Sequence, residues 1–135
     1  MYICQNFDIS ELVPEKIYSQ YGQEAWELLD DRLLITIDAV SDFFGSCVIN
    51  DYMSGGRRQW SGLRTSDCPW YTQRSQHNFG RAVDLVFADI TAEKAREKIL
   101  KHREKLFPFI TSMELNVSWV HIDVRNHKAL KLFEG

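Results

Sequence analysis

Hydrophobic residues recur at helical spacing in the N-terminal third of the chain. Between about 24 and 44, the apolar positions that repeat three and four residues apart are Leu33, Leu34, Ile37, Val40 and Phe44. This spacing predicts a long amphipathic helix whose apolar stripe faces the core, with Gly45 as its stop signal. A shorter helix is predicted over 9–22, because Pro14 suits a first helical turn and Gly22 can end the helix.

The second half of the chain alternates between strand and helix patterns. Residues 82–87, AVDLVF, predict a strand. Thr91 is a suitable N-cap for a helix over about 92–106. The residues expected to face inward from that helix are Ala95, Ile99, Leu100 and Leu106. Two further strands, over about 109–115 and 118–124, flank a tight turn and predict an antiparallel hairpin.

A short strand is predicted over 46–50, and a long polar stretch follows it. Residues 51–74, DYMSGGRRQWSGLRTSDCPWYTQR, are rich in glycine, serine, arginine and aromatic side chains. Loops of this length inside a compact domain tend to carry function. Helices first, then strands with one helix inserted, predict an α+β fold with a small, mostly antiparallel sheet packed with helices.

Composition narrows the class of protein. The chain has 135 residues, 44% of them hydrophobic, which suits a single domain over 1–135 with N-terminal helices over 1–44. A formal charge of −3 argues against a nucleic-acid or anionic-membrane surface. No apolar run approaches the roughly 20 residues of a membrane helix, and the N-terminus lacks the regions of a signal peptide. We therefore expect a protein made in the cytoplasm. Its cysteines, Cys4, Cys47 and Cys68, are too few and too irregularly spaced for a disulfide framework.

Two of the four histidines occupy unusual surroundings. His102 lies in the charged segment KILKHREK and His127 lies near the C-terminus, so both are expected at the surface. His77 and His121 lie beside aromatic or apolar residues, where an unpaired imidazole would be costly. Asp84 is embedded in the predicted strand AVDLVF, where a lone carboxylate is rare unless it is paired or bound to a metal.

These side chains can converge. The strand period of two places His121 and Asp123 on one face of the last predicted strand. If that strand neighbours the strand of Asp84, the two can meet, and the intervening glycine turn can bring His77 to the same point. Two imidazoles and a carboxylate, with a fourth position left to water, form a ligand set used by catalytic zinc. A structural, hydrogen-bonded His–Asp pair is the alternative.

Three segments resemble a known family. SQHNFGRAVD, residues 75–84, resembles without a gap the SxHxxGxAxD signature of the zinc D-Ala-D-Ala carboxypeptidases and L-alanyl-D-glutamate peptidases, which cut peptidoglycan stem peptides and serve in several phage endolysins. WVHIDVR resembles the family's second motif, a strand with the last zinc-binding histidine, and SGLRT at 61–65 is similar to its SGYR-type segment. HNFGRAVDL also resembles the hedgehog signalling domain, which shares this fold. The resemblance covers about residues 45–125.

The resemblance implies a hedgehog/DD-peptidase-like fold and metal-assisted hydrolysis of an amide bond. The zinc ligands that it implies are His77, Asp84 and His121. Arg64 is the candidate for stabilising the developing oxyanion or pairing with a substrate carboxylate. The candidate substrate-binding residues are Arg64, Ser75, Gln59 and Trp119.

The general base is not fixed by the motifs. Many family members carry a glutamate three residues before the last histidine, but here that position is Ser118. A hairpin loop of two or four residues would place Glu114 opposite Trp119, on the face of His121. Hedgehog-type sequences also have a glutamate several residues upstream, so Glu114 is favoured. Asp123 shares the His121 face directly and is the second candidate, and a three-residue loop would reverse the preference.

The motifs leave several functional alternatives open. A non-catalytic, zinc-bound binding module on the same fold is one, and a structural or virion protein is another. The bond that is cut, D-Ala-D-Ala or L-Ala-D-Glu, is not specified. The expected partner is a peptidoglycan peptide rather than nucleic acid or membrane, the expected state is a monomer, and the apparent lack of a signal peptide and wall-binding module suits a phage-encoded enzyme.

Overall fold

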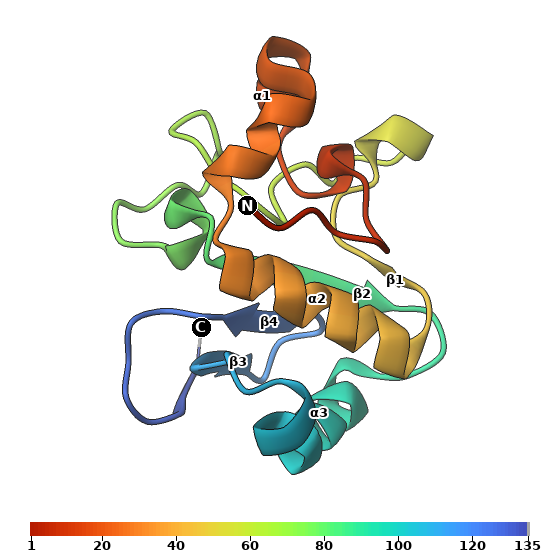
Figure 1. Cartoon of the computed structure of the whole chain (residues 1–135), viewed down its shortest axis with the longest axis vertical. Coiled ribbons are helices and arrows are strands. Elements are labelled where there is room, and N and C mark those ends of the chain that lie inside the picture. Colours follow the sequence, from red (N-terminus) through yellow and green to blue (C-terminus); the bar gives the residue numbers. More distant parts are fainter. Residues whose placement is uncertain (135) are drawn as a thin grey trace.

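The computed structural model describes residues 1–134 and shows an α+β fold with three α-helices and a five-stranded sheet (Figure 1). The helices are α1 (Glu15–Tyr21), α2 (Asp31–Phe44) and α3 (Ala92–Leu106). The strands are β1 (Cys47–Val48), β2 (Ala82–Phe87), β3 (Ser112–Leu115), β4 (Val120–Asp123) and β5 (Lys131–Glu134). Short 3-10 helices lie at Ile9–Glu11, Gly22–Leu28, Tyr52–Ser54 and Gln76–Phe79.

The sheet has the strand order β1-β2-β4-β3-β5, and every neighbouring pair is antiparallel except β3 and β5. Helix α2 crosses in front of β2 and β4, while α3 lies at the end of the molecule away from α1 (Figure 1). Fully buried apolar residues alternate along the central strands, namely Val83, Leu85, Met113, Val120 and Ile122. Strand alternation therefore leaves the opposite face of the sheet for the polar residues between them.

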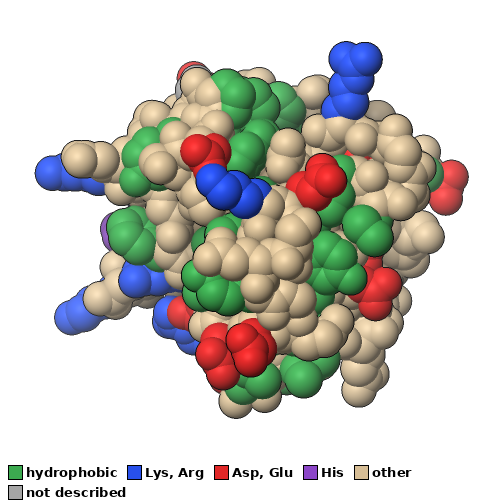
Figure 2. Space-filling model, turned by 90° about the horizontal axis from the view of Figure 1, so that it is seen from above, with side chains coloured by type: hydrophobic (Ala, Val, Ile, Leu, Met, Phe, Trp, Pro, Cys, Tyr) green, Lys and Arg blue, Asp and Glu red, His purple; other side chains and the backbone are tan. Residues whose placement is uncertain are grey.

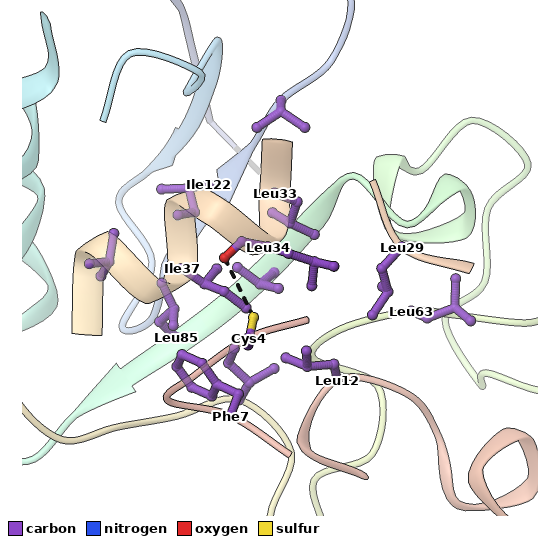
Figure 3. Close-up of a cluster of buried hydrophobic side chains, with 14 of the residues drawn as sticks. Cys4, Phe7, Leu12, Leu29, Leu33, Leu34, Ile37, Leu63, Leu85 and Ile122 are labelled. Carbon is purple, nitrogen blue, oxygen red and sulfur yellow. Dashed lines mark hydrogen bonds between the residues drawn. The ribbon is translucent and has the colours of Figure 1, made fainter. Parts of the chain in front are cut away.

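Helix α2 forms the core together with that apolar face. Figure 3 shows Leu34 and Ile37 of α2 gathered with Leu85 of β2 and Ile122 of β4. Each fully buried aliphatic side chain of this kind contributes about 1.5–3 kcal/mol of transfer free energy. The predicted apolar stripe is confirmed, apart from its last member Phe44, which is half-buried.

The predicted start of that helix is wrong. Residues Gly22–Leu28 form a 3-10 helix, and Leu29 is extended with ψ 139°. Asp30 then begins a new helix, because its carboxylate accepts a hydrogen bond from the backbone N–H of Arg32 at 2.8 Å. This N-cap interaction separates the two segments.

The predicted helix over 9–22 is also divided. A 3-10 turn ends at Glu11, and Pro14 lies in an extended conformation before α1. The carbonyl groups of the buried residues Leu12 and Val13 accept hydrogen bonds from distant parts of the chain, Leu63 N–H at 2.8 Å and Asn50 Nδ2 at 3.0 Å. A proline disfavours helical geometry in the residue before it, so the chain crosses the core here instead of continuing as a helix.

The predicted bounds of β2 and α3 are confirmed, including the N-cap at Thr91, whose hydroxyl accepts from Lys94 N–H at 3.2 Å. Ala95 and Ile99 are fully buried as expected, but Leu106 is 43% exposed, and the next residue, Phe107, is buried in its place. The strands predicted over 46–50, 109–115 and 118–124 are shorter than expected, and β5 was not predicted.

The N-terminal segment is attached to α2 through one buried carboxylate. Asp38 accepts hydrogen bonds from Tyr2 Oη at 2.6 Å, Gln5 N–H at 2.8 Å and Asn6 N–H at 3.0 Å. The three cysteines are free, with Cys4 and Cys68 buried and Cys47 half-buried. No helix within residues 1–134 combines the length and hydropathy of a membrane span.

Candidate metal centre

A row of four side chains crosses the polar face of the sheet. Asp84 of β2 is the direct cross-strand partner of His121 on β4, and Glu114 of β3 is the partner of Phe133 on β5. The β3–β4 register pairs Met113 with Ile122, so its continuation by one residue brings Glu114 level with His121. All four residues of the row line one cavity of about 810 Å³. The sheet register therefore assembles residues from four strands at one place.

His77 reaches this row from a 3-10 turn that precedes β2. The Ser75 hydroxyl accepts a hydrogen bond from His77 N–H at 3.3 Å, and Gly80 ends the turn with φ 68°. A Cβ atom at Gly80 would lie 2.1 Å from the carbonyl oxygen of Leu28, so only glycine fits this approach. The glycine of the sequence motif thus has a physical role: it turns the chain so that His77 lies over the strand of Asp84.

The three predicted ligands converge on one carboxylate oxygen. His77 Nε2 lies 3.3 Å from Asp84 Oδ1, and His121 Nδ1 lies 3.0 Å from the same atom. One ligand atom from each of the three residues lies within 4.8 Å of the others. Both imidazoles are buried, with exposed fractions of 3% and 6%. This group could hold a metal ion.

Hydrogen bonds on the far side of each ring fix the tautomers. His77 Nδ1 lies 2.8 Å from the Gly62 carbonyl oxygen, and His121 Nε2 lies 2.8 Å from Asp123 Oδ2. Both partners are acceptors, so each of those nitrogens carries the proton. The remaining nitrogens, His77 Nε2 and His121 Nδ1, face Asp84 Oδ1, so a proton or a metal ion between them would balance the charge of the carboxylate. Ligating histidines are held in this way in metal proteins.

The electrostatics of the site agree with a requirement for positive charge. Burial raises the pKa of Asp84, but hydrogen bonds from His121 and His77 outweigh burial and hold this pKa well below its ordinary value. Burial lowers the pKa of His121, whereas its hydrogen bonds to Asp123 and Asp84 raise it to about 9. Without a metal, a proton on His121 therefore supplies the charge that a metal ion would otherwise bring.

Asp123 lies behind His121 rather than in the cavity wall. It is fully buried, and its two oxygens are occupied by Arg125 Nε at 2.8 Å, Arg125 Nη2 at 2.6 Å and His121 Nε2 at 2.8 Å. Burial raises the pKa of Asp123, but the bonds from Arg125 and His121 bring it down to about 2. The carboxylate is thus kept ionised and holds the His121 ring in place.

Arg64 forms an ion pair with Asp84, as Arg125 does with Asp123. Its Nη2 donates to Asp84 Oδ2 at 3.1 Å, and its Nε donates to the carbonyl oxygen of Trp60 at 2.7 Å. The Asp84 carboxylate therefore presents Oδ1 to the histidines and Oδ2 to a guanidinium. The Arg64 side chain lines the cavity, and its third nitrogen, Nη1, has no protein partner among residues 1–134.

The predicted substrate-binding residues all line the same cavity. Trp119 is half-buried there instead of lying in the core. The Gln59 amide oxygen accepts from Glu15 N–H at 3.3 Å, and the Ser75 hydroxyl caps the turn of His77. Glu114 lies on the cavity face, as the sequence predicted for a four-residue loop, but it is level with His121 instead of opposite Trp119. His102 and His127 lie away from this cavity.

Several residues of the site were not identified from the sequence. Phe133 contacts the His121 ring with ring centroids 5.6 Å apart, and the Arg125 guanidinium lies 5.2 Å from the Phe133 ring centroid. The carbonyl of Gly62, which orients His77, gives no signal in the sequence because any residue supplies a carbonyl. Arg125 lies two positions after Asp123, just beyond the end of β4, and a period of two continued along WVHIDVR could have pointed to it.

Neither protein-family models, nor curated proteins, nor solved structures gave a match to this chain. The site is therefore interpreted from its own geometry and from the motifs in the sequence.

Proposed function

We propose that this protein is a zinc-dependent peptidase that hydrolyses amide bonds in peptidoglycan stem peptides. The observation that carries the proposal is the convergence of His77 Nε2 and His121 Nδ1 on Asp84 Oδ1, at the wall of a cavity of about 810 Å³. A cavity of this size suits a short peptide or a drug-sized ligand. The fold that the motifs imply, hedgehog/DD-peptidase-like, belongs to the same proposal.

The ligand set supports zinc with one position left open. Two imidazoles and one carboxylate hold zinc in several hydrolases, and the same set also suits ferrous iron. Glu114 favours the hydrolytic interpretation, because a carboxylate beside the ligands is what the removal of a proton from water requires. When bound, zinc would supply a Lewis acid that polarises the scissile carbonyl and makes water more acidic.

The chain's own residues account for the proton transfers. Glu114 lies on the cavity face with no ion-pair partner among residues 1–134, so its carboxylate can accept a proton from the attacking water and deliver it to the leaving amine. The Nη1 of Arg64 can donate to the oxyanion that develops on the carbonyl, or to a substrate carboxylate. Asp123 acts as a positioning residue through His121.

The substrate class rests on the motif resemblance. SQHNFGRAVD, WVHIDVR and SGLRT occur in the order found in peptidases that cut the D-Ala-D-Ala or L-Ala-D-Glu bond, and the structure brings residues of all three segments to one cavity. Either bond suits the proposal. A phage-encoded, monomeric enzyme that acts on the cell wall is the corresponding biological role.

Digestion of purified peptidoglycan tests the proposal. The zinc-loaded protein should release fragments shortened by one D-Ala, or split at L-Ala-D-Glu, as identified by mass spectrometry. The Glu114→Gln variant is the matched control, since it keeps the side-chain size and removes the base. Equal digestion by the two proteins would contradict the assignment of Glu114, and zinc binding without any released fragment would leave a non-catalytic binding module.

A further inference from the structure

The cavity that contains the metal-binding group has a basic lining, although the chain as a whole carries a formal charge of −3. Its arginines are Arg57, Arg58, Arg64, Arg74 and Arg125, and its carboxylates are Asp51, Asp84 and Glu114. Five cations thus face three anions. On the face of the molecule seen in Figure 2, acidic and basic side chains both occur among hydrophobic and polar surface.

Three of these arginines form no ion pair with a carboxylate of the described residues. Within residues 1–134, the arginine ion pairs are Arg32–Asp30, Arg64–Asp84 and Arg125–Asp123. Arg57, Arg58 and Arg74 are exposed, and no carboxylate of the described residues forms an ion pair with them. Their guanidinium groups are therefore available to a ligand.

The turn that bears Arg57 and Arg58 is held by one aspartate. Asp51 Oδ1 accepts from Arg58 N–H at 2.7 Å, and the Asp51 backbone bonds to Gly56 N–H and to the Arg58 carbonyl, each at 3.0 Å. A Cβ atom at Gly56 would lie 2.1 Å from the Asp51 carboxylate, so glycine is needed for this close approach. The two arginines are thus carried by a closed turn at the cavity.

The turn that bears Arg74 is held by the motif that supplies His77. Asn78 Nδ2 donates to the Thr72 carbonyl at 2.6 Å, and Ser75 N–H donates to the same carbonyl at 3.3 Å. The arginine-bearing turn is therefore connected to the histidine-bearing turn through Asn78. Preorganised donors lose less entropy on binding than donors on free loops.

We propose that Arg57, Arg58 and Arg74 form an anion-recognition rim that selects acidic peptides carrying free carboxylates for the cavity. This inference rests on the proposed function, because an arginine fork matches carboxylates and phosphates alike. Trp60, Trp70 and Trp119 also line the cavity and offer apolar surface to a peptide chain. The rim is separate from Arg64, which is bound to Asp84.

Binding of two matched peptides tests the rim. One probe is a synthetic stem pentapeptide that contains both the L-Ala-D-Glu and the D-Ala-D-Ala bond and carries two free carboxylates, and the other is the same peptide with both carboxylates converted to carboxamides. Tryptophan fluorescence reports binding, since three tryptophans line the cavity. The variant Arg57→Gln/Arg58→Gln/Arg74→Gln removes the rim, and Lys98→Gln/Lys101→Gln/Lys105→Gln removes the same charge from the exposed face of α3.

The wild-type protein should bind the acidic peptide about tenfold more tightly than the amidated one, because exposed charge pairs each contribute little. The rim variant should lose this preference, the α3 variant should keep it, and rising salt should weaken it. Equal binding of the two peptides by wild type, no binding of either, or an unchanged preference in the rim variant would overturn the inference.

Two further outcomes separate the possible failures. Tighter binding of a single-stranded oligonucleotide of equal charge would overturn the assignment to peptides. Hydrolysis of both peptides by wild type and rim variant at equal KM would refute the rim while the proposed function stands. A rim-dependent preference without any hydrolysis would support the rim and contradict the proposed function.

Discussion

Asp84 and His121 are direct cross-strand partners in the antiparallel pair of β2 and β4, with Oδ1 of the first 3.0 Å from Nδ1 of the second. This contact connects the two sequence motifs that carry the resemblance. It also explains why a carboxylate can occupy the middle of an otherwise apolar strand: its side chain points to the polar face, where two imidazoles and a guanidinium meet it.

Replacement of Glu114 should separate catalysis from metal binding. Glu114 lines the cavity without contacting the three ligands, so Glu114→Gln should bind zinc as tightly as wild type and lower kcat by about 10²–10⁴-fold. Isothermal titration with zinc and a fragment-release assay measure the two quantities. A variant with full activity would show that Glu114 is not the base.

Replacement of Asp123 should instead weaken zinc binding more than it lowers kcat. Asp123 is fully buried and fixes the His121 ring through Nε2, so Asp123→Asn should weaken zinc binding by about 10–100-fold. At saturating zinc, most of the activity should return. Unchanged zinc affinity with a lost kcat would instead support Asp123 as the base, the second candidate from the sequence.

Zinc binding should be coupled to proton release. The hydrogen bonds of His121 raise its pKa to about 9 in the metal-free protein, so at pH 7 the ring carries a proton that zinc must displace from Nδ1. Zinc affinity should therefore rise about tenfold per pH unit up to pH 9 and level off above it. Competition with a chromophoric chelator across this range gives the slope. An affinity that is independent of pH would contradict the protonation assigned to His121.

The N-terminal attachment should contribute strongly to stability. Asp38→Ala leaves the Tyr2 hydroxyl and two backbone N–H groups without their acceptor, so the free energy of unfolding should fall by about 3 kcal/mol. Tyr2→Phe removes one of these hydrogen bonds and should cost only about 1 kcal/mol. Urea denaturation compares the two. A smaller loss for Asp38→Ala than for Tyr2→Phe would show that the Asp38 carboxylate does not hold the N-terminal segment on α2.

Local signals in the sequence were sufficient for some elements. The bounds of β2 and α3 follow from residues next to each other in the chain: the AVDLVF pattern and the cap at Thr91. The helix over 24–44 was predicted too long because its apolar pattern continues across Asp30, whose side-chain hydrogen bond to the backbone ends one segment and starts the next. Strand β5 was missed because its parallel pairing with β3 depends on a return of the chain that no local pattern encodes.

The candidate site also contains residues that local signals identify and residues that only long-range pairing brings in. His77, Asp84 and His121 were singled out because polar residues in an apolar pattern are costly unless they are paired, and the motif resemblance implied them as a ligand set. Phe133 and the Gly62 carbonyl were not, since their roles come from the register of β3 with β5 and from a loop backbone. The side of the sheet on which Glu114 lies depended on loop length, which the strand period alone does not fix.

The metal content of the purified chain tests the central claim most directly. Wild type and the surface variant His127→Ala should each carry one zinc per chain, measured by mass spectrometry of the metal, while His77→Ala and Asp84→Ala should carry none although circular dichroism shows them folded. Wild type should also gain about 2.7 kcal/mol of stability at free zinc a hundredfold above Kd. A folded wild-type protein with no bound metal after incubation with zinc, or equal zinc content in the Asp84→Ala variant, would contradict the account.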